Sequence, residues 1–315
     1  MSVIFNTENE VLNMYEWQEI INEFLIDIKI RAYSDQTIYN YKVKLKNIED
    51  FFESANVKID EISKKDIKMW IAHMLTEDKQ ASTINATINR LSKLLSYMVE
   101  EEYIEKNVLS GFKRLRAQKK IIYPLNDYEI RQLITVCKHH KYKHIAQRNT
   151  VMFMMMLECG LRISEVANLK NTDILENQIV IRNSKNNKDR ALAITPILKK
   201  EMLKYNRIKN NKYKDGECEY YFISSLNCGM NPKSIFSIMK RMKEDMDIRE
   251  VVRFSGHTLR HTYAHMAIRN GMDIYTLSMN MGHGTITMTQ NYLQTLKSDD
   301  FVKKSVQYST LKNLR

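Results

Sequence analysis

The sequence has little glycine, proline and cysteine. Its 315 residues include only 8 glycines and 3 prolines, too few to turn the chain repeatedly between the strands of a large sheet. Leu, Met, Lys and Glu, which favour helices, are frequent. The composition therefore predicts a mostly α-helical protein in which any sheet is small.

The cysteines and apolar runs are equally sparse. The 4 cysteines form no Cys-x-x-Cys pair, so their spacing predicts neither a zinc ribbon nor a disulfide framework. The longest apolar run, residues 151–157, is far shorter than the roughly 20 residues that a membrane helix needs. Residues 1–10 do not have the basic and then apolar pattern of a secretory signal. We expect a cytoplasmic, nucleoid-associated protein that does not enter a membrane.

Positive charge is concentrated in one part of the chain. Lys and Arg total 49 against 37 Asp and Glu, a formal charge of +12. Residues 1–112 carry 13 basic and 19 acidic side chains, whereas residues 113–315 carry 36 basic and 18 acidic ones. Such asymmetry is typical of a protein in which one part contacts a polyanion. Nucleic acid is the partner that this charge distribution predicts.

Residues 14–112 are predicted to form a helical DNA-binding domain. Apolar residues recur there at intervals of three and four, which places them on one face of each of four helices. Ser34 is predicted to cap the second helix, Ser63, three residues before Asp66, to start the third, and Ser82 to begin the fourth. The polar face of the fourth helix could contact phosphates or simply face solvent. Its candidate DNA-binding residues are Thr83, Asn89, Arg90 and Lys93.

A basic linker is predicted at residues 113–124. It could follow a phosphate backbone or act as a solvated tether, and the two readings are compatible. Its candidate DNA-binding residues are Lys113, Arg114, Arg116, Lys119 and Lys120. A second, mainly helical domain is expected at 125–303, with a β-hairpin formed by 178–182 and 191–194 and a C-terminal tail at 304–315.

Three short segments combine residues that could address one phosphate. His257 and Arg260 lie three residues apart and would share a helix face. Arg162 follows a glycine, and His283 precedes Tyr292 by nine residues. For each segment alone, a surface arginine, a capping histidine or a packed tyrosine is the better explanation. Their joint occurrence favours a functional site.

Four segments together resemble the tyrosine recombinases, a family that includes phage and transposon integrases and Xer-type resolvases. The resemblance covers residues from about 14 to 303. The four segments occur in the order and at the spacings that are typical of the family. The segments are CGLRISEVANLK (159–170), SKNNKDR (184–190), HTLRHT (257–262) and MGHGTITMTQNY (281–292).

The resemblance implies how the phosphate is attacked. Tyr292 would be the nucleophile, which leaves a 3′-phosphotyrosine and a free 5′-hydroxyl. Arg162 and Arg260 would bind the non-bridging oxygens, where negative charge develops in the transition state. His283 would donate a further hydrogen bond to the same phosphate.

It also implies how protons move. Lys185 would protonate the leaving 5′-oxygen. Lys188 is the alternative for this role, because the family usually has glycines beside its lysine and this sequence has serine and asparagine. His257 would accept the proton of the phenol, and Glu165 would orient Arg162.

The resemblance further implies a two-domain clamp around double-stranded DNA that carries specific recombination sites. The working unit would be a tetramer on two sites, in which the tail 304–315 docks on a neighbouring copy. An accessory directionality factor is a candidate partner. No cofactor is expected, because the covalent intermediate keeps the bond energy that ATP would otherwise supply and paired arginines take the electrostatic role of a metal.

Three other readings remain open. His257, His261 and His265 are spaced four residues apart and could ligate a metal, although packed core histidines explain the same pattern. The patch of Cys137, His139, His140 and His144 matches no zinc signature and is read as an exposed loop. The protein could instead bind DNA without cleaving it, or be a tyrosine-type topoisomerase that relaxes arbitrary supercoiled DNA.

Overall fold

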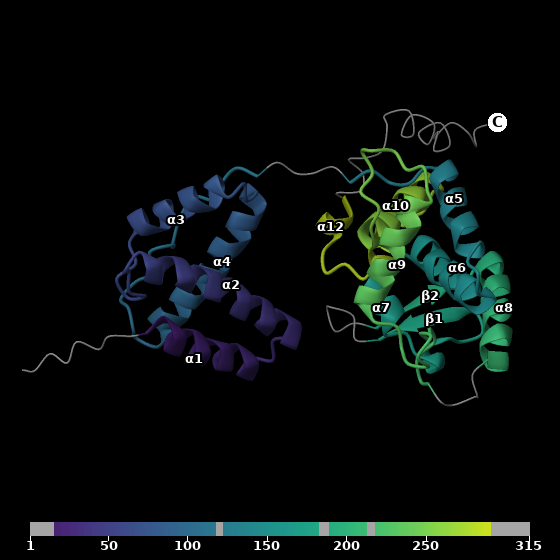
Figure 1. Ribbon diagram of the computed structural model, residues 1–315, viewed down its shortest axis with the longest axis horizontal. Helices are drawn as coiled ribbons and strands as arrows, with labels where there is room; N and C mark the ends of the chain where they lie inside the picture. The colour runs from purple at the N-terminus through teal and green to yellow at the C-terminus, as the bar shows by residue number, and fades with distance from the viewer. Residues whose placement is uncertain (1–15, 118–121, 183–188, 213–217, 291–315) are drawn as a thin grey trace, which may run out of the picture. The chain divides into compact units, whose positions relative to one another are not determined.

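The protein forms two compact units, an N-terminal unit up to Lys120 and a C-terminal unit from Ile121 (Figure 1). The computed structural model describes residues 16–117, 122–182, 189–212 and 218–290. Helices dominate both units, which confirms the predicted mostly α-helical class. Among the described helices, none is long and apolar enough to cross a membrane.

Four helices pack around one core in the N-terminal unit. Trp17, Phe52 and Trp70 are buried in this core, and the rings of Trp17 and Phe52 stack with centroids 5.5 Å apart. The apolar face predicted for the fourth helix is buried as well. The helices are α1 (Trp17–Ile30), α2 (Asp35–Ser54), α3 (Lys64–Thr76) and α4 (Ala81–Glu100).

Side-chain caps define two of these helix starts as predicted. Ser34 accepts a hydrogen bond from the backbone N–H of Thr37, and Ser63 forms a reciprocal capping box with Asp66. The predicted start of the fourth helix at Ser82 was one residue late, because α4 begins at Ala81 and its N-cap is Gln80. Gln80 makes no side-chain cap bond, so the residue pattern alone does not reveal where this helix begins.

The C-terminal unit is built around α6. Residues 151–156 of this helix are all buried, so α6 is surrounded by α5, α8 and α10 instead of lying on the surface. The described helices of this unit are α5 (Asp127–Lys138), α6 (Lys143–Glu158), α7 (Ile163–Ala167), η1 (Asn171–Asp173), α8 (Pro196–Lys212), α9 (Pro232–Glu244), α10 (Gly256–Arg269), α11 (Ile274–Met281) and α12 (Ile286–Gln290).

A two-stranded antiparallel sheet interrupts the helices, as the sequence predicted. Strand β1 (Gln178–Ile181) pairs with β2 (Arg190–Ala193), with Ile181 opposite Arg190. Ile179, Ile181 and Leu192 bury their side chains in the core. The register therefore places Arg190 at the end of the paired strands that is closest to residues 182–189.

Candidate active site

Arg260 lies on α10 with its guanidinium buried between two segments. The helix begins directly after Ser255, whose hydroxyl accepts from the backbone N–H of Thr258. One turn later, Arg260 is only 3% exposed. Its Nη1 donates to the carbonyl of Gly160 at 2.6 Å and its Nη2 donates to the carbonyl of Met281. Two backbone segments therefore hold this cation in one orientation.

Gly160 is required where it stands. Its φ is +63°, which is in the left-handed region, and a Cβ added there would lie 2.4 Å from Cδ1 of Tyr263. The close approach brings the Gly160 carbonyl within reach of Arg260. The glycine break noted in the sequence is thus part of how the arginine is positioned.

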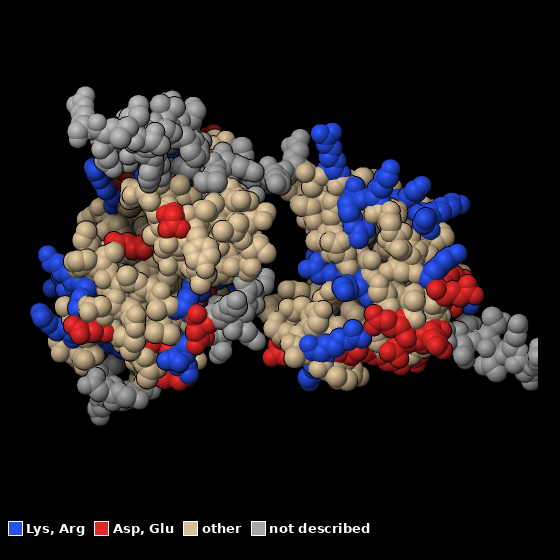
Figure 2. Space-filling model, turned by 180° about the vertical axis from the view of Figure 1, so that it is seen from behind, with Lys and Arg blue, Asp and Glu red and all other residues tan. Residues whose placement is uncertain are grey.

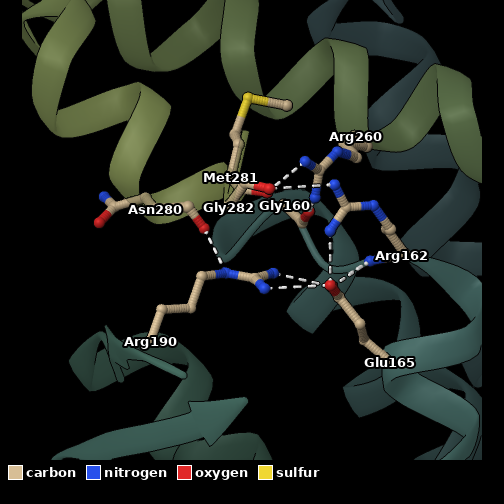
Figure 3. Close-up of polar contacts among 8 residues, drawn as sticks. All are labelled: Gly160, Arg162, Glu165, Arg190, Arg260, Asn280, Met281 and Gly282. Atoms are coloured by element: carbon tan, nitrogen blue, oxygen red, sulfur yellow. Dashed lines mark hydrogen bonds and ion pairs between the residues drawn. The ribbon is translucent and has the colours of Figure 1, made fainter. Parts of the chain in front are cut away.

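Arg162 lies next to Arg260, as Figure 3 shows. It is the N-cap of α7, and its Nη1 donates to Glu165 at 2.7 Å while its backbone N–H donates to the same carboxylate at 2.8 Å. Its Nη2 approaches the Gly282 carbonyl at 3.4 Å. Since Arg260 bonds the carbonyl of Met281, the two guanidiniums meet consecutive carbonyls of one turn.

A third arginine, Arg190, completes the cluster. Its Nη1 and Nη2 donate to the two oxygens of Glu165 at 3.0 and 2.8 Å, and its Nε donates to the carbonyl of Asn280 at 2.8 Å. Arg190 ends the segment SKNNKDR (184–190), which indicated no role for it. Its place at the end of that motif was the only signal, because its burial depends on contacts made 25 and 90 residues away.

His283 follows the left-handed Gly282 that ends α11. Its Nδ1 lies 2.7 Å from Oγ1 of the fully buried Thr289 on α12, a contact that the sequence did not indicate. Burial, followed by the charges of Arg260, Arg162 and Arg190, lowers the pKa of His283 to about 4. The ring is therefore neutral at pH 7 and held through one nitrogen.

His257 lies one turn before Arg260 on α10 and is exposed. Partial desolvation, followed by the charges of Arg260, Arg162 and Arg253, lowers its pKa below the ordinary value. At neutral pH this ring also carries no charge and can accept a proton.

The cluster has an excess of positive charge. Glu165 forms ion pairs with Arg162 and Arg190, and the guanidinium of Arg260 lies beside them on backbone carbonyls, which gives 3 − 1 = +2 for these four residues. Arg190 and Glu165 have side chains that are 7% and 9% exposed, whereas Arg162 is 23% exposed. Such a partly open, positively charged site suits an anion with several oxygens, such as a phosphate diester.

Several predicted site residues lie outside the described residues. They are Lys119, Lys120, Lys185, Lys188, Tyr292 and the tail 304–315. Thr289, the last buried residue of α12, precedes Tyr292 by three positions.

The candidate DNA-binding residues of the N-terminal unit lie on and beside α4. Thr83, Asn89 and Lys93 are exposed and Arg90 is half-buried, and in the following segment Lys113, Arg114 and Arg116 are exposed. Figure 2 shows the acidic side chains of this unit gathered toward one edge of the visible face, with basic side chains on other parts. The acidic net charge of this unit is therefore unevenly distributed.

The first part of the basic segment is attached to α4. The Asn85 amide donates to the Leu115 carbonyl at 2.8 Å and accepts from the Leu115 N–H at 2.9 Å. Arg114 also donates to Asn89 at 2.9 Å. Basic side chains from two parts of the chain thus share one surface. Nothing in the sequence indicated that Asn85 holds them together.

The histidine-rich patterns do not gather metal ligands in the part of the chain that the structure describes: no group of three His, Cys, Asp or Glu side chains is arranged to bind an ion there. His261 is a buried core residue. Its burial, followed by the charge of His265, lowers its pKa to about 4. The four cysteines are free thiols.

Comparisons with known proteins agree with this architecture. Residues 124–299 match the model of the phage integrase family, and residues 21–102 match the phage integrase N-terminal SAM-like domain. Tyrosine recombinase XerD of Rickettsia bellii is 26% identical over 88% of this chain and 95% of its own length. Tyrosine recombinase XerC of Thermodesulfovibrio yellowstonii is 25% identical over 89% of this chain and 92% of its own length.

Two solved structures share the fold. A lambda integrase (75–356) dimer bound to a COC′ core site has a TM-score of 0.71 at 14% identity, covering 89% of this chain and 96% of that one. The Tn1549 transposon integrase in complex with a circular intermediate DNA has a TM-score of 0.68 at 19% identity, covering 92% and 99%. Because the family model matches more than half of the 315 residues, the chain belongs to the phage integrase family of tyrosine-type site-specific recombinases.

Proposed function

We propose that this protein cuts and rejoins DNA at specific sites through a 3′-phosphotyrosine, without metal or ATP. The phenol oxygen of Tyr292 attacks the scissile phosphorus, the new P–O bond forms, and the bond to the 5′-oxygen breaks. His257 takes the phenol proton, and Lys185 gives a proton to the leaving oxygen. Attack by another 5′-hydroxyl reverses these steps and releases the tyrosine.

The observation that carries the proposal is the placement of Arg162 and Arg260 on consecutive carbonyls. These bonds hold the two guanidiniums side by side, where they could bind the two non-bridging oxygens of one phosphate. His283 directly follows Met281 and Gly282, the two residues that provide these carbonyls. These donors are fixed before the phosphate arrives, so they stabilise its developing charge without reorganisation.

The protonation of the histidines agrees with the roles proposed for them. His257 and His283 both have lowered pKa values and are neutral near pH 7. A neutral His257 can accept the phenol proton, whereas a protonated one could not. A neutral His283 can still donate one N–H to the phosphate.

We further propose double-stranded DNA with paired recombination sites as the substrate and a tetramer at the nucleoid as the working form. The exposed basic side chains on α4 and the segment after it, among them Lys93 and Arg116, support contact with the phosphate backbone. A lambda integrase of the same fold has been solved as a tetramer bound to a Holliday junction. An accessory directionality factor would set the choice between integration and excision.

A covalent-trapping assay tests the chemistry. The protein is incubated in EDTA with a nicked duplex taken from the DNA beside its own gene, so that the cut strand diffuses away. A protein–DNA adduct is expected with the wild type and with Tyr275→Phe, a change in an exposed tyrosine of α11. Tyr292→Phe is expected to form none.

Three results would contradict parts of this proposal. Bound DNA without any adduct would indicate a non-catalytic DNA-binding protein. An adduct that requires Mg²⁺ would refute the metal-free mechanism. Relaxation of arbitrary supercoiled plasmid would indicate a topoisomerase, which needs no paired sites.

A further inference from the structure

We propose that Arg190 is a positioning residue of the recombination reaction, which holds Arg162 in place through Glu165 and links the β-hairpin to the turn before His283. The inference deepens the function proposed above, since it concerns the same site. Arg190 itself would not contact the DNA.

The Glu165 carboxylate is shared between two arginines. Its Oε1 accepts from Nη1 of Arg162 at 2.7 Å and from Nη1 of Arg190 at 3.0 Å. Its Oε2 accepts from the backbone N–H of Arg162 and from Nη2 of Arg190, both at 2.8 Å. With both oxygens bonded on both sides, the carboxylate cannot rotate unless hydrogen bonds break. Arg162 is therefore fixed by a group that Arg190 itself fixes (Figure 3).

Arg190 differs from the buried Arg260 in that both of its Nη atoms donate to a carboxylate, that of Glu165, which balances its charge. Its side chain is only 7% exposed, and Nε and both Nη atoms are bonded to protein acceptors. A Cβ added to Gly282 would lie 3.0 Å from Nη1 of Arg190. The guanidinium is thus covered by the turn that carries His283, whereas Arg162 is 23% exposed.

The charge of Arg190 also favours the anionic form of Glu165. Burial alone would raise the pKa of Glu165, but the hydrogen bonds and charge of Arg190, followed by those of Arg162, outweigh burial and lower it. Removing Arg190 would leave a buried carboxylate with one guanidinium partner. Such a group binds a proton more readily and then holds Arg162 less firmly.

Arg190 connects the hairpin to the turn at residues 280–282, which precedes His283. It is paired with Ile181 at the end of the sheet from which residues 182–189 depart. It also donates to the carbonyl of Asn280, the residue before the two carbonyls that meet Arg260 and Arg162. The hairpin base, Glu165 and this turn therefore form one hydrogen-bonded unit.

Arginine variants on the same hairpin test the inference. Arg190→Met removes all three donors, and Arg190→Lys keeps the charge without the planar fork. Arg182→Met is the matched control, because Arg182 follows Ile181, the strand partner of Arg190, but is exposed and pairs with Asp173 instead of Glu165. Single-turnover adduct formation on the nicked duplex is measured together with DNA affinity and the unfolding temperature.

We expect Arg190→Met to slow adduct formation by about 10- to 100-fold, as a misplaced catalytic group does. Arg190→Lys should fall between Arg190→Met and the wild type, Arg182→Met should match the wild type, and DNA affinity should stay within about 3-fold for all of them. If Arg190→Met does not fold, Arg190→Lys decides the question. A rate for Arg190→Lys equal to that of the wild type would then overturn the inference.

A double-mutant cycle separates positioning from general destabilisation. In an Arg162→Lys background, Arg190→Met should have little further effect, because Arg190 acts through Arg162. A full additional loss of rate would overturn the inference.

A measurement that does not depend on activity distinguishes this inference from the proposed function. The Nε–H resonance of Arg162, assigned with Arg162→Lys in ¹⁵N-labelled protein, should shift in Arg190→Met and Arg190→Lys but not in Arg182→Met. If the wild type forms no adduct, the proposed chemistry fails and this resonance alone decides the role of Arg190. An unchanged resonance in both Arg190 variants would overturn it.

Discussion

His283 Nδ1 and Thr289 Oγ1 lie 2.7 Å apart, and this contact joins the turn after α11 to α12. Thr289 is fully buried, so the hydroxyl is not replaced easily by water. It fixes the ring of His283, which we propose to bind the phosphate. Thr289 itself precedes the proposed nucleophile Tyr292 by three residues. One hydroxyl thus orients the histidine that we propose as a phosphate ligand.

Replacing this hydroxyl should reduce cleavage. Thr289→Val keeps the shape of the side chain but cannot bond His283, and we expect adduct formation to slow by about 10-fold, less than the roughly 100-fold that removal of a transition-state donor causes. Thr289→Ser keeps the hydroxyl and should retain most of the rate. Equal rates for Thr289→Val and the wild type in single-turnover assays would show that the contact does not matter.

Gly160→Ala should destabilise the C-terminal unit and impair the site. A left-handed backbone costs a non-glycine residue about 1–3 kcal/mol, and the contact with the Tyr263 ring adds an overpacking cost of about 1–3 kcal/mol. Gly271→Ala is the matched control, because its φ is also positive at +103° but a Cβ there meets nothing within 4 Å. Thermal unfolding should rank wild type, Gly271→Ala and Gly160→Ala in decreasing order. A reversed order of the two variants would contradict the packing argument.

Asn85→Leu should release the basic segment from α4. The amide of Asn85 forms a donor and an acceptor bond with the backbone of Leu115, and leucine can form neither. Limited trypsin digestion should therefore cut faster after Arg114 and Arg116. Thr83→Ala, a change in an exposed residue of the same helix, should leave the digestion rate unchanged. An unchanged rate for Asn85→Leu would show that other contacts hold the segment.

The stability of the C-terminal unit should decrease as the pH falls from 6.5 toward 5. His261 and His283 have pKa values of about 4 in the folded protein, below the ordinary value of about 6.5. The unfolded chain then binds more protons, so the stabilisation present above pH 6.5 is lost progressively on acidification. Urea unfolding at pH 7, 6 and 5 checks this, and His283→Asn should weaken the dependence. A midpoint that rises on acidification would have the wrong sign.

Local patterns predicted much of the fold. The Ser34 and Ser63 caps, the apolar helix faces and the two strands follow from interactions within a few residues along the chain. The start of α4 was misplaced because Gln80 makes no side-chain cap bond, which leaves Ser82 as the more conspicuous candidate. The attachment of Leu115 by Asn85 spans 30 residues and has no local signal.

The site also contains residues that local sequence patterns indicated and contacts that they did not indicate. Arg162, Arg260 and His283 were selected because they occur in recognisable segments, and the structure brings them to one turn. The contacts of Arg190 with Glu165 and of Thr289 with His283 depend on how α7, β2, α11 and α12 pack. A sequence pattern shows which residue types are present, but the burial that gives them partners arises from packing. The roles of Lys185 and Tyr292 stay predictions.

The most direct test of the central claim identifies the amino acid that becomes attached to DNA. The adduct formed in EDTA on the nicked duplex is digested with trypsin and nuclease, and the modified peptide is sequenced by mass spectrometry. Our account predicts a 3′-phosphonucleotide on Tyr292 and none on Tyr263 or Tyr275. Attachment to any other residue, or through a 5′-phosphate, would contradict it.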